Sequence, residues 1–135
     1  MLGVNLIHAC FSYDNPEKII LALADNLNQD RFQIDMFSIM GPDFEKVDNR
    51  LMSLLLVKNG LSHSAMFGPK GNVLQASEAL YKKNVLVLRG RFRPVTNVNV
   101  DMMLNGLKVI KKESEMEKSH LLAITELALH DLTLA

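Results

Sequence analysis

The stretch NVLVLRGRFRPVTNVNVDMM, residues 84–103, decides the fold class that we expect. It opens with alternating valines and leucines, which favour a β-strand that is apolar on both faces. A glycine and a proline-bearing loop follow, and apolar side chains then support a helix over residues 100–112. A buried strand that leads through a short loop into a helix is typical of α/β proteins.

Further strands and helices are predicted along the rest of the chain. Apolar or alternating segments indicate strands, and apolar residues that recur every three or four positions indicate helices. The predicted strands are 2–10, 32–39 and 84–90, and the predicted helices are 16–28, 43–59, 76–83, 100–112 and 114–134. Pro16 stands at a first helical position, with Asp14 or Asn15 as the cap. Ser114 and Glu117 have the spacing of a capping box that opens the last helix.

These elements predict an α/β fold with a mixed central sheet of four or five strands that is covered by helices. The turn GPKG, residues 68–71, adds a hairpin of two short strands. No linker or low-complexity stretch divides the chain. We therefore expect one α/β domain over residues 1–135, either complete or as a fragment of a longer protein.

Charge and cysteine content narrow the function classes. Fifteen basic and fifteen acidic residues cancel, so the chain lacks the broad positive field with which most nucleic-acid and anionic-membrane binders attract their partner. No apolar run approaches the roughly 20 residues that cross a bilayer. Cys10 is the only cysteine, and the histidines lie in separate segments. We expect a cytoplasmic protein with no metal site and with neither a nucleic acid nor a membrane as its partner.

The loop after the predicted strand 84–90 is the candidate binding site. The amide groups and the dipole at a helix start attract phosphate, and Gly90 lets the backbone approach a ligand closely. On an extended chain the three neighbouring arginines project to one side, where they can clamp phosphate bidentately. The candidate phosphate- or nucleotide-binding residues are Arg89, Gly90, Arg91, Arg93, Thr96 and Asn99. The alternative is that the arginines solvate a strand end and that the glycine and proline only shape a turn.

This loop resembles the opening motif of a known enzyme family. The pattern G-x-F-x-P-x-[HT] of the nucleotidylyltransferase superfamily, which includes the nicotinate-nucleotide adenylyltransferases, is matched by Gly90, Phe92, Pro94 and Thr96. The longer string MFGPKGNVLQASEALYKKNVLVLRGRFRPV, residues 66–95, is similar to part of larger bacterial proteins of that kind.

The resemblance implies adenylyl transfer from ATP with Mg²⁺ to an acceptor similar to nicotinate mononucleotide. It also implies that the basic groups and the helix start stabilise charge on the α-phosphate. The family pattern continues to Gly-His, where this chain has Val98 and Asn99. No catalytic residue is therefore assigned, and no covalently bound cofactor is expected.

A second resemblance points to a non-enzymatic function. The order helix, SHSAMF, GPKG, NVLQAS, helix is similar to the opening of roadblock and profilin-like modules, which dimerise and hold partners. The predicted last helix carries a wide leucine-rich stripe, which favours self-association. The alternative function is thus a dimerising interaction module that forms a homo-oligomer through its C-terminal helix or its hairpin.

Overall fold

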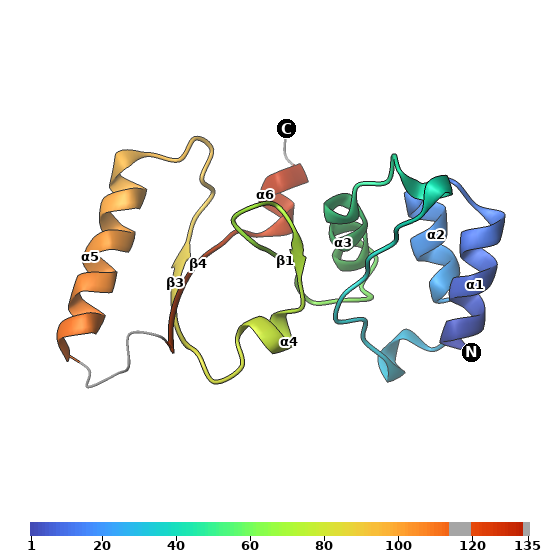
Figure 1. The fold of residues 1–135 in the computed structure, drawn as a ribbon, viewed down its shortest axis with the longest axis horizontal. Coiled ribbons are helices and arrows are strands. Elements are labelled where there is room, and N and C mark those ends of the chain that lie inside the picture. The colour runs from blue at the N-terminus through green and yellow to red at the C-terminus, as the bar shows by residue number, and fades with distance from the viewer. Residues whose placement is uncertain (114–119, 134–135) are drawn as a thin grey trace. The chain divides into compact units, whose positions relative to one another are not determined.

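The computed structural model describes residues 1–113 and 120–133, and the chain divides into two compact units. Unit 1 spans Met1–Glu78, and unit 2 spans Ala79–Ala135. Unit 1 is mainly helical, whereas unit 2 combines a pair of strands with a long helix (Figure 1). That residues 1–135 form a single domain stays a prediction.

Three helices build the core of unit 1: α1 (Leu2–Ser12), α2 (Pro16–Leu23) and α3 (Asn49–Lys58). Helix α2 packs against both of the others, and its apolar residues face them at helical spacing, as the sequence predicts for 16–28. The helix ends earlier than predicted, at Leu23. The buried apolar side chains of this core are Ala9, Ile19, Ile20, Leu23, Phe37, Met52, Leu56 and Leu61.

Side-chain caps fix the starts of α2 and α3. Oδ1 of Asn15 accepts hydrogen bonds from the backbone N–H groups of Glu17 and Lys18, at 2.9 and 3.3 Å. Asn15 is thus the cap of α2, one of the two residues that the sequence offers for this role. Oδ1 of Asp48 accepts from the N–H of Arg50 at 2.9 Å, so α3 begins after this aspartate and later than predicted.

The predicted strand 32–39 is wrong. This segment is an irregular connection between the 3₁₀ helices η1 (Gln29–Arg31) and η2 (Pro42–Phe44). The N–H of Ile34 donates to the carbonyl of Leu61 at 2.8 Å, and the side chain of Asn49 bonds to Ile39. The segment pairs with a loop carbonyl and a side chain instead of a neighbouring strand, so no ladder forms.

The hairpin at GPKG is confirmed. Strands β1 (Met66–Phe67) and β2 (Val73–Leu74) pair in antiparallel orientation and form a sheet of their own. Gly71 lies in the turn with a φ of 78°, a conformation that glycine adopts without steric cost. Helix α4 (Ala76–Ala79) follows and is shorter than the helix predicted at 76–83.

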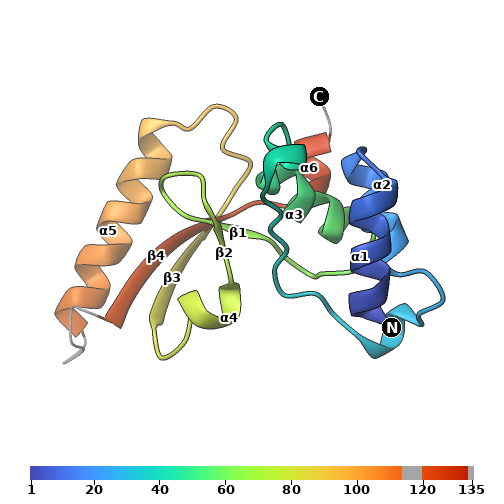
Figure 2. The same cartoon turned by 45° about the vertical axis from the view of Figure 1, so that its right-hand side comes forward.

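Unit 2 is built on two parallel strands. Strand β3 (Asn84–Arg89) pairs with β4 (Leu121–Glu126), and Asn84 lies opposite Leu121. Helix α5 (Asn97–Glu113) connects them along the chain, and the short helix α6 (Leu129–Thr133) follows β4. Figure 2 shows β3 and β4 side by side, with α5 running along them. The strand and the helix predicted from the stretch 84–103 are confirmed.

A glycine lets α5 approach the sheet closely. A Cβ atom on Gly106 would lie 3.2 Å from Cδ2 of Leu86, which is tighter than most contacts of this kind. Leu86 and Leu88 therefore belong to the face of β3 that α5 covers. The side chain of Val87, which points to the other face, is 46% exposed. Strand β3 is thus not the buried central strand that its sequence predicts.

The predicted central sheet of four or five strands is wrong, although helices and strands do occur together. The described residues contain two separate sheets with two strands each, β1–β2 and β3–β4. Segments 2–10 and 32–39 do not contribute a strand. The pair β3–β4 consequently lacks further partners within the described part of the chain.

The first predicted strand is the helix α1. Its residues at positions 5 and 9 lie one turn apart on the face that contacts α2. The amide of Asn5 donates to the carbonyls of Leu23 and Asp25, at 3.0 and 2.8 Å, and so satisfies groups at the end of α2. Ala9 is fully buried on the same face. The residues of this segment that contact α2 are thus four positions apart, as in a helix, and not two apart, as in a strand.

The long C-terminal helix predicted at 114–134 is also wrong over residues 121–126, which form β4. The β-branched pair Ile124 and Thr125 suits a strand, and the backbone partner is β3. The predicted capping box of Ser114 and Glu117 lies outside the described residues. In the ranges 1–113 and 120–133, no helix has the length and apolar character needed to cross a membrane.

Candidate functional site

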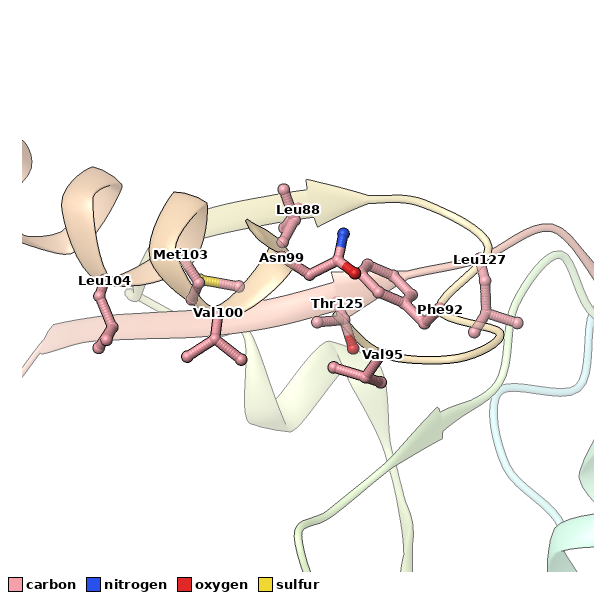
Figure 3. A pocket seen from close by; sticks show the side chains of 9 residues that line it. All are labelled: Leu88, Phe92, Val95, Asn99, Val100, Met103, Leu104, Thr125 and Leu127. Carbon is pink, nitrogen blue, oxygen red and sulfur yellow. The ribbon is translucent and has the colours of Figure 1, made fainter. Parts of the chain in front are cut away.

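A groove in unit 2 lies between α5 and the ends of the two parallel strands (Figure 3). Its volume is about 310 Å³. Most of its lining side chains are apolar, and the polar ones are an asparagine and a threonine. We call this hollow the α5 groove, and its lining residues are Leu88, Phe92, Val95, Asn99, Val100, Met103, Leu104, Thr125 and Leu127.

Three parts of unit 2 supply the walls of the α5 groove. Positions 99, 100, 103 and 104 lie on one face of α5, because they recur at helical spacing. Leu88 and Thr125 are paired neighbours on β3 and β4, so their side chains project from the same face of the sheet. The loops that follow the strands add Phe92, Val95 and Leu127. The groove thus lies at the carboxyl ends of parallel strands, where open α/β sheets bind ligands.

The backbone around Phe92 directs its ring toward the groove. Phe92 has a φ of 51°, in the left-handed region that non-glycine residues seldom adopt. A Cβ atom on Gly90 would lie 3.2 Å from the tip of the ring, so the ring folds back over the glycine. Gly90 therefore provides space for an aromatic wall of the groove.

Two of the three candidate arginines form ion pairs within unit 2. Nη2 of Arg89 lies 2.8 Å from Oε1 of Glu126, and Nε of Arg91 lies 3.3 Å from Oδ1 of Asp131. Both guanidinium groups stay largely exposed to solvent.

The third arginine, Arg93, binds a main-chain group instead. Its Nη2 donates to the carbonyl of Leu132 at 3.2 Å. All three arginines therefore contact the chain that runs from the end of β4 into α6, and not one another.

Thr96 and Asn99 form a hydrogen-bonded turn at the start of α5. Oδ1 of Asn99 accepts from the backbone N–H and the hydroxyl of Thr96, at 2.9 and 2.8 Å. The N–H of Asn99 also donates to Oγ1 of Thr96 at 3.4 Å. This reciprocal arrangement satisfies groups at the helix start, as a cap does. A phosphate at this place would compete with the side chain of Asn99.

Of the six predicted site residues, only Asn99 lines the α5 groove directly. Gly90 acts beneath the Phe92 ring, and Thr96 belongs to the helix start. Arg91 and Arg93 flank Phe92 in the sequence, and all three arginines contact the C-terminal segment. A phosphate-binding role for these residues stays a prediction.

Sequence reasoning missed the apolar walls and the acidic partners of the arginines. The helical spacing of Val100, Met103 and Leu104 was available in the sequence, but it indicates burial in general and not a groove. Glu126 and Asp131 lie in the segment 114–134, for which the sequence predicts one long helix. Their relation to the arginines becomes visible only when β4 is placed beside β3.

No group of three or more histidine, cysteine or acidic residues that suits a metal ion occurs among the described residues. His8 and Cys10 lie on a helix, where a separation of two places them on different faces. Burial raises the pKa of the Cys10 thiol, which opposes formation of a reactive thiolate. This pair therefore does not have the features of a nucleophile with its base.

Comparisons of the chain with protein-family models, curated proteins and solved structures found no match. The resemblances to nucleotidylyltransferases and to roadblock and profilin-like modules therefore rest on the quoted sequence strings alone.

Proposed function

We propose that unit 2 binds a small ligand that joins an apolar ring to an anionic group, and that a nucleotide is the class that fits best. The observation that carries this proposal is the α5 groove at the carboxyl ends of two parallel strands. Pockets for small molecules are typically apolar hollows of 300–1,000 Å³ with a few polar groups, a description that this groove meets at the lower limit.

The two halves of such a ligand would use different residues. The ring would lie in the α5 groove against Phe92 and Met103, and the amide of Asn99 would give it a polar contact. The phosphate would use Arg91 and Arg93, which flank Phe92 in the sequence. Guanidinium groups bind phosphate oxygens bidentately, and the high exposure of the Arg91 side chain leaves it accessible.

We propose binding and not adenylyl transfer. In the family that the loop resembles, a Gly-His pair stands where this chain has Val98 and Asn99. Asn99 already accepts two hydrogen bonds from Thr96 at the helix start. Neither residue can supply the positive charge that the histidine of the motif offers. ATP with Mg²⁺ and nicotinate mononucleotide are therefore proposed as ligands to be tested, and not as substrates.

Thermal unfolding with and without ligands tests this proposal, because a ligand that binds only the folded state raises its stability. The ligands are ATP with Mg²⁺, nicotinate mononucleotide, NAD and inorganic phosphate. We expect a nucleotide to raise the melting temperature, and the Arg91→Ala/Arg93→Ala variant to lose this response. The control is Lys111→Ala/Lys112→Ala, which removes the same charge from the end of α5. Equal responses in both double variants would rule out the arginine site.

The alternative function, a dimerising interaction module, is favoured by a different feature in unit 1. Helix α1 carries no acidic or basic residue in its first or last turn, and it exposes Val4, Ile7 and Phe11 on neighbouring positions of the helix surface. The Phe11 side chain is 89% exposed. Contiguous exposed apolar residues are typical of protein interaction sites. The C-terminal helix proposed for this role from the sequence is replaced by β4 over residues 121–126.

Light scattering of the purified chain distinguishes the two functions. If α1 mediates dimerisation, the wild-type chain is a dimer, and Ile7→Ser/Phe11→Ser is a monomer. Tyr81→Ser is the control, because it removes another exposed aromatic side chain outside α1. A monomeric wild-type chain over the accessible concentration range would eliminate this alternative. A cytoplasmic location remains part of our proposal, since the chain has a single cysteine.

A further inference from the structure

The segment that follows β4 contacts the two arginines to which the proposed function assigns the phosphate. The carboxylate of Asp131 lies 3.3 Å from Nε of Arg91, and the carbonyl of Leu132 accepts from Nη2 of Arg93 at 3.2 Å. The carboxylate carries a negative charge and the carbonyl oxygen a partial negative charge, so both resemble a phosphate oxygen as acceptors. We call residues 126–132, which comprise the last residue of β4 and the segment after it, the C-terminal strap.

The strap begins with a third contact of the same kind. Glu126, the last residue of β4, pairs with Arg89 at 2.8 Å, and the N–H of Gly90 donates to its carbonyl at 3.1 Å. Every second residue of the segment 89–93 thus contacts an acceptor in the strap, and the contacts follow the same order along both segments. The strap and the segment 89–93 are therefore joined at several points and not at a single one.

The contacts of the strap are of a weak type. The Arg91 side chain is 80% exposed, whereas that of Asp131 is 22% exposed. Ion pairs in contact with solvent contribute little to stability, because water screens the attraction and two side chains lose freedom. A phosphate with two negative charges and several acceptor oxygens makes stronger bonds to guanidinium than one carboxylate does. Such a ligand can replace Asp131.

The strap also forms part of the α5 groove. Leu127, its second residue, lines the groove together with Phe92 (Figure 3). Displacement of the strap from the arginines would therefore change the groove wall at the same time. The anion site and the ring site are linked through one short segment.

We propose that the C-terminal strap is an internal competitor for the anionic ligand: Asp131 and the Leu132 carbonyl hold Arg91 and Arg93 until a phosphate group displaces them. This inference rests on the proposed function and adds its regulation. Ligand binding then releases the strap, and removal of the Asp131 charge strengthens ligand binding.

The first test compares the affinity for ATP and for inorganic phosphate in the wild-type chain and in Asp131→Asn. We expect affinity to rise by about twofold to fivefold, the range that corresponds to loss of one exposed ion pair. Asp101→Asn is the control, because it removes the same charge from an exposed position on α5. An equal gain in both variants, or no gain in Asp131→Asn, would overturn the competition. Absence of binding to either protein would instead refute the proposed function, and with it this inference.

The second test follows the strap itself by amide hydrogen exchange. The N–H of Asp131 donates to the carbonyl of Ala128 at 3.0 Å, so its exchange rate reports the folding of the strap. We expect faster exchange in Arg91→Ala/Arg93→Ala than in the wild-type chain, and faster exchange in the wild-type chain when phosphate is added. Lys111→Ala/Lys112→Ala again serves as the control. Unchanged exchange in the arginine variant would show that the arginines do not hold the strap.

Discussion

The side chain of Asn49 binds both backbone polar groups of Ile39. The N–H of Ile39 donates to Oδ1 of Asn49 at 2.8 Å, and Nδ2 of Asn49 donates to the carbonyl of Ile39 at 3.1 Å. An asparagine amide thus makes the two hydrogen bonds that a residue of a neighbouring strand would make in a sheet. The first residue of α3 holds the connection that crosses the core of unit 1.

Replacement of Asn49 by alanine should destabilise unit 1. The variant leaves two partly buried backbone groups without their partner, and an unsatisfied buried group costs about 1–3 kcal/mol. We expect a loss of about that size in the free energy of unfolding, measured in urea by circular dichroism. Asn105→Ala, an exposed position on α5, is the control and should have little effect. A loss of less than about 0.5 kcal/mol, the range of ordinary surface substitutions, would contradict the role of this amide.

The connection at 32–40 also shows what alternating hydrophobicity can and cannot predict. Phe32, Ile34, Phe37 and Ile39 are buried or partly buried, whereas Met36 is exposed, so most apolar residues of the predicted strand face the core. The apolar residues of the segment predict burial, but they do not identify the hydrogen-bond partners of its backbone groups. A side chain on α3 and a loop carbonyl take that role here, and both lie outside the segment.

Local patterns likewise predict β3 and α5 but not β4. The strand 84–89 and the helix 97–113 follow from their own residues, since valines and leucines alternate in the first and the polar face is continuous in the second. Strand β4 depends on pairing with residues 37 positions away, as Arg89 opposite Glu126 illustrates. Its leucines fit a helical stripe equally well when they are considered alone.

The candidate site, too, could be predicted from local sequence patterns only in part. The loop 90–96 can be recognised in the sequence, because its glycine and proline each indicate a turn and its arginines indicate a charged site. The α5 groove has no such marker. It arises where an apolar helix face and two strand ends meet, so it could be recognised only after the packing of α5 was known.

The ion pair of Asp48 and Arg50 should make the stability of α3 depend on pH. Hydrogen bonds from Arg50 hold the pKa of the Asp48 carboxyl below its ordinary value of 3.8. A carboxyl whose pKa is lowered in the folded state stabilises it above the ordinary pKa, and this contribution is lost as the pH falls through the lowered value. The melting temperature of Asp48→Asn should therefore lie below that of the wild-type chain at neutral pH, and the two should converge in acid.

The control for this prediction removes the partner. In the Arg50→Gln background the difference between aspartate and asparagine at position 48 should be smaller and should vary less with pH, since the side-chain hydrogen bonds are gone. Added salt should reduce the difference in the wild-type background, because both groups are exposed. A difference that is independent of pH would show that the cap and not the ion pair accounts for the effect of Asp48.

Replacement of Gly90 by alanine should displace the Phe92 ring within the α5 groove by a few tenths of an ångström. The new Cβ would lie 3.2 Å from the ring, so the ring must shift. The methyl resonances of Val100, which lines the same groove, should change as the ring moves. Gly3→Ala is the matched control, since a Cβ at that position meets no atom within 4 Å. Unchanged Val100 resonances in Gly90→Ala would show that the ring does not depend on this glycine.

The helical nature of α1 predicts opposite results at two neighbouring positions. In a strand, residues 7 and 9 would share one face, whereas in a helix a separation of two places them on different faces. Ile7 is 62% exposed and Ala9 is fully buried against α2. Ala9→Leu should overpack this contact and lower the free energy of unfolding by about 1–3 kcal/mol. Ile7→Ala should change it by less than about 0.5 kcal/mol, as at other surface positions, whereas truncation of a buried isoleucine would cost about 2–5 kcal/mol. Similar losses at both positions in urea unfolding would favour the strand that the sequence predicts, because only a strand buries both side chains on the same face.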